Sequence, residues 1–469
     1  MKSLRHVAGG IAASHPATAE VGLAVLRAGG TAADAAVAAV LTCCVAETIY
    51  TGLGGGGFAT YFDAATGKVT CLDFFVSVPG TDGDRQPGPM TAVDVFFGGV
   101  PQVYSIGGAS VAVPGVPLGL GEVHRRWGRL PWASVVEPAA ALARTGVVLP
   151  APQARTLISC APALAYGEGA SCYTPNGKLL EGGDVLFHPG LAAALDGLAA
   201  EGPSVFYTGA FASLMVDAVR AAGGALGPLD LASYRVRETP VDHASFAGQR
   251  VWARHDLSRT VDTIAALPAD IAELATPRRA VAMAAALRDR GRQKIGDTTN
   301  VSVVDAAGNA CVITTTLGLG AAVWLPGLGV NLNSMLGEGE LITAELMPGR
   351  RMSSNMCPLV VTGSAQDLVV AAGSAGASRI RTALIDTLLG LLVDGLDMPD
   401  AIGRPRFHVV EGTVHAEPGY PEDELSALAD AGWKVNRWAN IDHYFGGVTA
   451  VGAGGAAGDP RRGGVGLLL

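Results

Sequence analysis

Two adjacent threonines, Thr298 and Thr299, stand directly before a stretch in which polar and apolar residues alternate. A threonine hydroxyl becomes a nucleophile only when a base accepts its proton. The GxSxG and HExxH signatures, which mark other hydrolase nucleophiles and metal sites, do not occur in the sequence. The remaining base is the amine of the threonine itself. An α-amine has a pKa of about 8, close to the pH at which such a base must work.

An interior threonine has no free amine, so this chemistry requires that the chain first cut itself. The Thr298 hydroxyl would attack the carbonyl of Asp297, the peptide would become an ester, and water would release a new N-terminus at Thr298. The same pair has an ordinary interpretation, because β-branched residues favour strands. On the pattern alone the ordinary interpretation is the more common one, and both stay open.

The threonine pair opens a predicted β-hairpin. Its two alternating runs span residues 298–305 and 310–317 and are joined by a turn that contains glycine. Nearer the N-terminus, an Ala-rich helix is predicted from Thr31 to about Glu47, and its small side chains suit close packing against another element. A second hairpin follows, with its turn near residues 64–67.

The loop GLGGGGF, residues 52–58, precedes the first strand of this second hairpin. Four consecutive glycines allow close backbone approach, and their N–H groups could cradle an anion. The loop lacks the Lys and Ser/Thr of a phosphate loop, and it precedes a strand rather than a helix. A structural turn is the more common explanation, and a ligand cradle stays open as the alternative.

The remaining predicted elements indicate one interwoven layered domain rather than two separate domains. No internal repeat and no Pro/Ser-rich linker divides the chain. Periodicity predicts helices over 15–30, 116–146, 184–236 and 258–292, strands at 359–363 and 367–373, and helices over 378–395 and 397–407.

The composition restricts the class of protein. Of 469 residues, 49% are hydrophobic and 16% charged, enough to bury a large core. A net charge of −9 without a basic stripe argues against a nucleic-acid partner. No secretory signal is visible, and the most apolar early stretch carries Asp34 and Glu47, so no membrane span is predicted. Seven cysteines without CxxC spacing predict reduced thiols in a cytoplasmic protein, and nine scattered histidines predict no metal and no cofactor.

Eight motifs along both halves of the chain are specific enough to compare with known families. They are GIAASHPATAEVGLAVLRAGGTAADAAVAAVL, GLGGGGFATYFDAATGKVTCLDF, ASVAVPGVPLGLGEVHRRWGRLPW, TTNVSVVDAAGNACVITTTLG, GVNLNS, RRMSSNMCP, GSAGASRI and DAIGRPRFH. In these motifs and in their order the sequence resembles the γ-glutamyltransferase family. The middle, about 240–296, is shorter than in the family and lacks its Pro- and Ser-rich segment.

The resemblance implies an α+β protein with the four-layer αββα fold of the N-terminal-nucleophile hydrolases. It also implies self-cleavage between Asp297 and Thr298. The segment 1–297 would become a large fragment and 298–469 a small one, interwoven in one domain. The expected partners are therefore the two processed fragments, a small-molecule substrate and, as a possibility, a second copy in a homodimer.

Roles in catalysis carry over from the resemblance to four residues. Thr298 matches the nucleophile, and Thr316 matches a threonine whose hydroxyl supports it. Gly376 and Ala377 match a Gly-Gly pair whose backbone N–H groups form the oxyanion hole. Ala377 departs from glycine, but a backbone donor needs no glycine if its φ permits.

Substrate contacts carry over in the same way. Ser354 and Asn355 match a Ser-Ser pair that holds the substrate carboxylate. Asn333 and Glu338 align with a stretch that contacts the glutamyl amine, and the Glu338 alignment is the looser of the two.

Three positions depart from the family pattern. Phe75 stands where the family has an arginine that clamps the glutamyl carboxylate, and a neutral aromatic ring cannot make that charge-assisted contact. Asn300 replaces a histidine after the threonine pair, and Gly318 replaces an asparagine beyond Thr316. Cleavage and hydrolysis are therefore expected to persist while the contacts that recognise glutamate are lost.

Four functions follow, in order of preference. The first is an autoprocessed threonine hydrolase that cleaves an amide of a non-γ-glutamyl acyl group through an acyl-enzyme. The second is hydrolysis of a carbon–carbon bond next to a carbonyl in secondary metabolism. The third is true γ-glutamyl transfer or glutathione hydrolysis, and the fourth is an unprocessed pseudoenzyme or binding protein.

Overall fold

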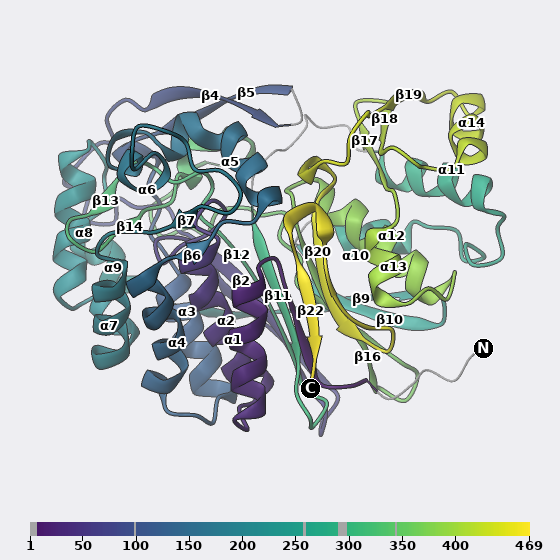
Figure 1. Ribbon diagram of the computed structural model, residues 1–469, viewed down its shortest axis with the longest axis horizontal. Coiled ribbons are helices and arrows are strands. Elements are labelled where there is room, and N and C mark those ends of the chain that lie inside the picture. Colours follow the sequence, from purple (N-terminus) through teal and green to yellow (C-terminus); the bar gives the residue numbers. More distant parts are fainter. Residues whose placement is uncertain (1–6, 98–99, 257–258, 289–297, 343–344) are drawn as a thin grey trace.

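The computed structural model describes residues 7–97, 100–256, 259–288, 298–342 and 345–469. Two large antiparallel sheets lie face to face at its centre, and helices cover the outer face of each (Figure 1). This helix–sheet–sheet–helix order is the αββα arrangement of an α+β protein. The expected fold is therefore confirmed.

The first sheet has seven strands, and β11 lies near its centre between β1 and β12. It contains strands from before and after residue 298, and β1 lies between two strands of the later segment, so the two predicted segments are interwoven. Its order is β22 (Val465–Leu468), β1 (Gly10–Ala13), β11 (Thr299–Val304), β12 (Ala310–Thr316), β2 (Gly56–Asp63), β3 (Lys68–Phe74) and β8 (Arg237–Thr239).

The second sheet has six strands and packs against the first mainly through β16 and β20. Its β9 and β10 belong to the middle segment, where periodicity predicted no strand. Its order is β21 (Gly455–Gly458), β20 (Gly447–Gly452), β16 (Leu368–Ala375), β15 (Leu359–Thr362), β10 (Gln249–Arg254) and β9 (Val241–Phe246).

The Ala-rich helix α2 (Ala32–Ala46) forms the centre of the layer on the first sheet. It is buried along its whole length, because its small side chains let other helices and the sheet approach closely. Thr31 caps it in a capping box with Asp34. Around it lie α1 (Pro16–Arg27), α3 (Val116–Trp127), α4 (Trp132–Thr145), α7 (Leu191–Glu201), α8 (Ala210–Ala221) and α9 (Pro228–Ser233).

The layer on the second sheet is built from later helices. The predicted helix over 258–292 is two helices in the described residues, α10 and α11. Pro268 lies in the break between them and has no N–H for a helical hydrogen bond. The helices of this layer are α10 (Thr260–Ala265), α11 (Thr276–Leu287), α12 (Arg379–Leu392), α13 (Met398–Gly403) and α14 (Glu422–Asp430).

Smaller elements lie at one end of the sheets (Figure 1). These smaller elements are β4 (Thr91–Phe97), β5 (Val100–Ile106), β6 (Val147–Val148), α5 (Ala151–Leu164), α6 (Ala170–Tyr173), β7 (Val185–Leu186), β13 (Trp324–Leu325), β14 (Val330–Asn331), β17 (Phe407–Val410), β18 (Thr413–Ala416) and β19 (Lys434–Arg437).

No helix in the described ranges is both long and apolar enough to cross a bilayer.

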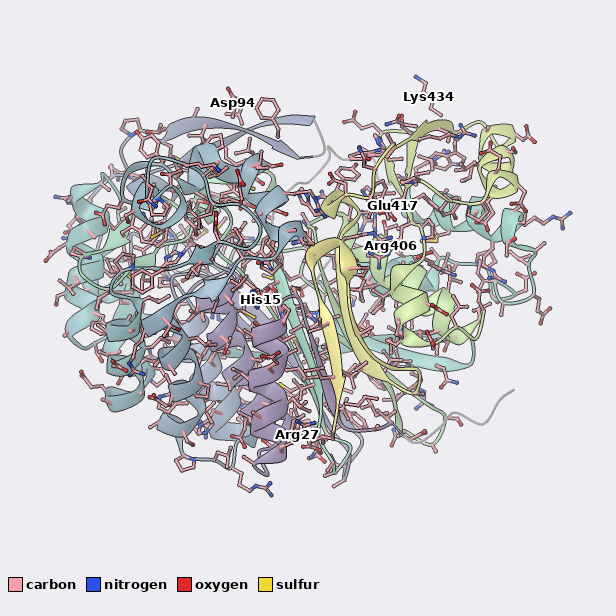
Figure 2. All side chains as sticks on the ribbon, viewed as in Figure 1. His15, Arg27, Asp94, Arg406, Glu417 and Lys434 are labelled. Carbon is pink, nitrogen blue, oxygen red and sulfur yellow. The ribbon has the colours of Figure 1, made fainter. Side chains whose placement is uncertain are left out.

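Between β21 and β22 the chain crosses from the second sheet to the first and carries a buried ionic network. Arg461 donates to Glu417 and to Asp459, and Arg406 lies 2.8 Å from the other oxygen of Asp459. These four side chains are almost fully buried (Figure 2). Burial alone raises the pKa of Asp459, but the guanidinium groups of Arg406 and Arg461 outweigh it and hold that pKa below its usual range. The network therefore fixes the crossing that leads back to the first sheet.

Candidate active site

Thr298 directly precedes β11 and lies inside the protein, with only 4% of the residue exposed. Its carbonyl oxygen accepts a hydrogen bond from Nη1 of Arg462 at 3.4 Å. Asp297, the other residue of the predicted cleavage site, lies outside the described residues. The structure thus places the predicted nucleophile directly before a central strand, whose pairing with β1 and β12 fixes the residues that follow it.

Thr299, the second threonine of the pair, is held in place by a buried carboxylate. The Thr299 hydroxyl donates to Oε2 of Glu47 at 2.5 Å, and Thr18 donates to the other oxygen of Glu47 at 3.0 Å. All three side chains are buried, so the carboxylate has its hydrogen bonds in the interior. Glu47 ends the Ala-rich helix α2, and through Thr299 it ties that helix to the first residue of β11.

Thr316 is the last residue of β12, at the end of the hairpin where Thr298 stands. Thr299 pairs with Thr315 in the antiparallel ladder, so Thr298 and Thr316 each stand one residue beyond this pair. Thr316 is buried, and its hydroxyl oxygen accepts the backbone N–H of Gly318 at 3.0 Å. The structure therefore places both threonines at the same end of the hairpin, and the supporting role of Thr316 stays a prediction.

The glycine-rich loop packs against this end of the sheet. A Cβ at Gly55 would lie 2.3 Å from the carbonyl oxygen of Thr316, and one at Gly57 equally close to that of Thr314. A Cβ atom at either position would clash with the neighbouring backbone, so both positions require glycine. This close packing supports the structural interpretation of the loop. The loop helps to hold Thr316 in place.

Gly376 and Ala377 form the turn between β16 and α12. Both have positive φ, 112° for Gly376 and 49° for Ala377. Gly446, just before β20, packs against Gly376, and Arg462 packs against Gly447. Because Arg462 also bonds Thr298, the turn and the nucleophile lie at the same end of the facing sheets. Their role as oxyanion donors remains a prediction.

Ala377 offers a direct test of this turn. The left-handed region is unfavourable for alanine and free of cost for glycine, although glycine loses more entropy on folding. We expect Ala377→Gly to stabilise the protein by about 0.5 to 1 kcal/mol. The branched Ala377→Val variant should lower the melting temperature, because a β-branched residue strongly resists positive φ. Differential scanning calorimetry checks both, and destabilisation by Ala377→Gly would contradict the backbone geometry.

Asn333 has no hydrogen-bonding capacity left for a substrate. Its amide nitrogen donates to the carbonyl oxygens of Gly54 and Ala112, both at 2.8 Å. Its amide oxygen accepts from the N–H groups of Ala112 and Met335. Two donors and two acceptor positions are all that the side chain offers. Asn333 therefore ties three backbone segments together beside the glycine-rich loop, which does not favour its predicted contact with a substrate amine.

Ser354 and Asn355 lie in the half-buried segment before β15. The Ser354 hydroxyl oxygen accepts the N–H of Met356 at 3.1 Å, and the side chain faces a surface cavity. Their predicted contact with a substrate carboxylate stays a prediction.

Other nucleophile and metal chemistry finds little support in the described residues. No group of three or more His, Cys, Asp or Glu side chains there is arranged to hold a metal ion. Burial, and then the nearby Glu47 carboxylate, raise the pKa of the Cys43 and Cys44 thiols. Burial also lowers the pKa of His408 well below its usual value. Neither cysteine is therefore a ready thiolate, and His408 stays neutral.

Comparison with known proteins agrees with this geometry. Residues 18–267 and 259–468 match the family described as Gamma-glutamyltranspeptidase. The chain belongs to the γ-glutamyltranspeptidase family. It is 28% identical to the Acylase ACY 1 proenzyme of Pseudomonas sp. (strain V22), over 94% of this chain and 89% of that protein. It is also 28% identical to Glutathione hydrolase 3 of Arabidopsis thaliana, over 91% of this chain and 78% of that protein.

Among solved structures, the chain is similar to cephalosporin acylase from Bacillus halodurans. The TM-score is 0.80 at 21% identity, with 100% of this chain and 97% of the other covered. At that identity the likeness concerns the fold, which is that of an N-terminal-nucleophile hydrolase. The family match and the two curated relatives make this chain an enzyme of the γ-glutamyltranspeptidase type.

Phe75 stands where the resemblance predicts an arginine in the family. It is 1% exposed and stacks on Phe58, with ring centroids 5.5 Å apart. The guanidinium of Arg254 lies over the other ring, 5.0 Å from the Phe58 centroid. Position 75 is therefore part of an aromatic pair inside the protein.

Asn300, which the resemblance aligns with a histidine of the family, lies between the two sheets. In either orientation of its amide, the side chain is 2.5 Å from Thr314 Oγ1 on β12 and 2.7 Å from Thr449 Oγ1 on β20. It is fully buried. These contacts join the sheets, and they do not favour its predicted contact with a substrate.

Gly318, which the resemblance aligns with an asparagine of the family, has φ of 67° and faces Glu338. A Cβ there would lie 2.5 Å from Oε1 of Glu338 and 2.7 Å from Oγ of Ser334. The buried Glu338 carboxylate thus occupies the space that a larger residue at 318 would need. Whether this carboxylate contacts a substrate remains a prediction.

Two residues of the site were missed from the sequence, Glu47 and Arg462. A signal existed for Glu47, because a carboxylate at the end of an apolar Ala-rich helix must find a buried partner. Arg462 follows Arg461 near the C-terminus and has the pattern of a surface residue. Only the crossing between the sheets brings it to Thr298.

Proposed function

We propose that this protein is a threonine N-terminal-nucleophile hydrolase that cuts itself before Thr298. It would then hydrolyse an amide whose acyl group is not γ-glutamyl. The position of Thr298 carries the proposal: it directly precedes a central strand, stands at the same end of the hairpin as Thr316 and accepts a hydrogen bond from Arg462 through its carbonyl oxygen. The acylase and glutathione hydrolase relatives support amide hydrolysis as the class of reaction.

Self-cleavage begins when Oγ1 of Thr298 attacks the carbonyl carbon of Asp297. The C–N bond breaks, an ester joins Asp297 to the hydroxyl, and the amine of Thr298 is freed. Water then hydrolyses the ester and leaves a carboxylate on Asp297. The chain is thereby divided into residues 1–297 and 298–469, which stay together because their strands pair with one another in one sheet.

In turnover, the freed amine of Thr298 accepts the proton of its own hydroxyl as Oγ1 attacks the substrate carbonyl. The N–H groups of Gly376 and Ala377 would stabilise the oxyanion, and the Thr316 hydroxyl would orient the nucleophile. The amine then protonates the leaving nitrogen. Water, deprotonated by the same amine, hydrolyses the acyl-enzyme.

The non-γ-glutamyl part of the proposal rests on Phe75. Its ring is buried against Phe58, and the nearby Arg254 is held by two carboxylates. The chain therefore lacks the family's cation at that position.

The seven cysteines are all buried and unpaired, which supports our further proposal of a reducing, cytoplasmic location.

The substrate claim is tested with γ-glutamyl-p-nitroanilide and the purified, processed protein. We expect little or no release of nitroaniline. In parallel, brief exposure to p-nitrophenyl acetate followed by mass spectrometry should place an acetyl group on the fragment that begins with Thr298. Efficient turnover of the γ-glutamyl compound would show that Phe75 does not exclude glutamate. A fragment without the acetyl group would contradict the acyl-enzyme.

A further inference from the structure

Arg462 is a buried cation beside the nucleophile. It ends the short turn η7 (Pro460–Arg462) on the crossing between the two sheets, and only 1% of the residue is exposed. Its Nη1 donates to the carbonyl oxygen of Thr298 at 3.4 Å. Its guanidinium also lies over the ring of Tyr50, 4.9 Å from the ring centroid. The interior of the protein therefore holds a guanidinium against the first residue of the proposed small fragment.

The path of this side chain depends on a glycine in the second sheet. A Cβ at Gly447 would lie 2.2 Å from Cδ and 2.6 Å from Nε of Arg462, so any side chain there would displace the arginine. Gly447 is the first residue of β20, and β20 packs against β11. The second sheet thus leaves the space through which Arg462 reaches Thr298.

Other ionisable side chains face this end of the hairpin from the surrounding elements. The carboxylate of Glu47 on α2 accepts two threonine hydroxyls, and that of Asp459 lies against two guanidinium groups of the ionic network. The ring of His15, which follows β1, is bonded at both nitrogens to backbone groups and accepts an N–H at Nδ1, so it is neutral. The remaining side chains are Glu338, Arg379 on α12, Arg406, Arg461, Cys43 and Tyr50.

A free amine at Thr298 lies close to the guanidinium of Arg462. The nitrogen and the carbonyl oxygen of one residue are roughly 3 Å apart, which places the amine within roughly 7 Å of Nη1. Two positive charges at this distance repel each other, and salt screens them little in the interior. The cation therefore favours the neutral amine and lowers its pKa below the ordinary value of about 8, against the opposite influence of Glu47 and Glu338.

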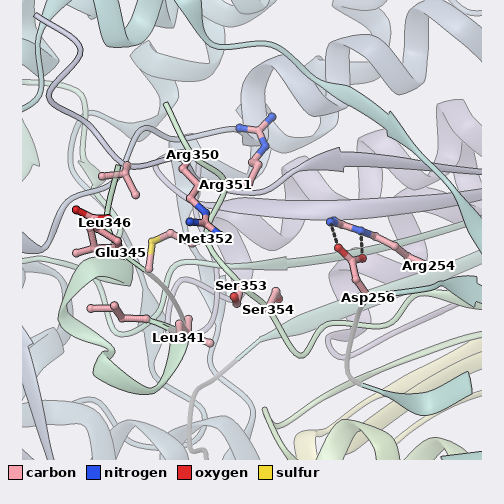
Figure 3. A pocket seen from close by; sticks show the side chains of 12 residues that line it. Arg254, Asp256, Leu341, Glu345, Leu346, Arg350, Arg351, Met352, Ser353 and Ser354 are labelled. Carbon is pink, nitrogen blue, oxygen red and sulfur yellow. Dashed lines mark hydrogen bonds and ion pairs between the residues drawn. The ribbon is translucent and has the colours of Figure 1, made fainter. Parts of the chain in front are cut away.

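Three further arginines line a surface cavity of about 290 Å³ (Figure 3): Arg254, Arg350 and Arg351. Two of them face the carboxylate of Asp73, and Arg350 is exposed to solvent. A charge that a carboxylate neutralises or that solvent screens has little effect on a distant buried amine. Arg462 is buried and bonds Thr298 directly, so its charge acts at short range.

We propose that Arg462 is a positioning residue of the nucleophile, which fixes the Thr298 carbonyl and keeps the freed amine in its neutral form. Only the neutral amine can accept the proton of the hydroxyl. The inference rests on the proposed hydrolase function and adds how its base is kept ready near neutral pH.

The test measures, as a function of pH, how fast the processed protein releases nitrophenol from p-nitrophenyl acetate. In the wild type the rate should rise with a midpoint below about 8, the ordinary pKa of an α-amine. Arg462→Gln keeps a donor for the Thr298 carbonyl and removes the charge. Its midpoint should lie about one pH unit higher, so the rate falls about 10-fold at low pH and is nearly unchanged above both midpoints.

Two variants are the matched controls. Arg462→Lys keeps both a donor and a charge, so its midpoint should stay near that of the wild type. Arg27→Met removes an equal charge at the exposed end of α1, away from His15 (Figure 2), and should leave the midpoint unchanged. An equal shift in Arg27→Met would assign the effect to net charge and overturn the role of Arg462.

Three other results overturn the proposal. They are a wild-type midpoint at or above about 8, an unshifted midpoint in Arg462→Gln, and an equal loss of rate at every pH in Arg462→Gln, which indicates a structural role alone. The first needs no variant, so it tests the proposal even if a variant fails to fold.

This inference and the hydrolase function fail in different ways. Protein that is acetylated at Thr298 but keeps its midpoint in Arg462→Gln contradicts the role of Arg462 alone. Protein that remains one chain and takes up no acetyl group contradicts the hydrolase function, and the role of Arg462 with it.

Discussion

A Thr298→Ala variant is expected to remain one chain of 47.5 kDa on a denaturing gel, while the wild type divides into two fragments. In proportion to 297 and 172 residues, the fragments should run at about 30 and about 17 kDa. The effect is all-or-none, because alanine has no hydroxyl to attack the preceding carbonyl. The variant should also fail to take up an acetyl group from p-nitrophenyl acetate.

Two controls separate chemistry from folding. Thr298→Ser keeps a hydroxyl and an amine, so it should still cut itself. N-terminal sequencing of the smaller wild-type fragment should begin at Thr298. An intact wild-type chain, identical on the gel to Thr298→Ala, would refute the autoprocessed enzyme and favour a binding protein.

Arg461→Met is expected to cause the largest loss of stability, about 3 to 5 kcal/mol. Arg461 faces Glu417 and Asp459, and all three side chains are almost fully buried. Removing the cation leaves two carboxylates in the interior with Arg406 as their remaining cation in this network. Uncompensated buried charge is costly because its hydration is lost. Thermal unfolding of the processed protein measures the effect.

Arg437→Met is the matched control, since Arg437 also pairs with a glutamate. Its side chain is 53% exposed and that of Glu422 is 70% exposed, so the change should barely move the melting temperature.

The pH dependence of stability gives a second check. The lowered pKa of Asp459 contributes stability at neutral pH that is lost as pH falls below about 4. The difference between wild type and Arg461→Met should therefore narrow in acid, and a constant difference would contradict this origin.

Local signals predicted most of the elements that hold the nucleophile. The alternation after Thr298 predicted the hairpin that β11 and β12 form, because period two places side chains on the two faces of a sheet. Thr31 and the alanines after it predicted α2. The strands β9 and β10 were missed. They pair with each other and β10 also pairs with β15, a contact more than 100 residues away in sequence.

The candidate site was predictable by residue type and only partly by position. Thr298 and Thr316 were expected to meet, and the register of the hairpin is local enough to place them at the same end. Asn300 and Asn333 were expected at the substrate, but the fold uses both amides between backbone segments and sheets. The sequence shows that an amide side chain is present. It does not show which buried donors and acceptors of the fold will form hydrogen bonds with that side chain.

The sequence by itself determined the fold class, the hairpin that begins at the threonine pair and the absence of a clamping arginine at position 75. The fold class and the position of the arginine came from the resemblance to the γ-glutamyltranspeptidase family, whereas the hairpin came from periodicity and turn residues. Only the tertiary structure decided that Glu47 anchors Thr299, that Arg462 reaches Thr298, and that Arg254, Arg350 and Arg351 line one cavity. Those contacts join residues that are distant in the chain, so they depend on how two sheets and their helices pack, which no local pattern encodes.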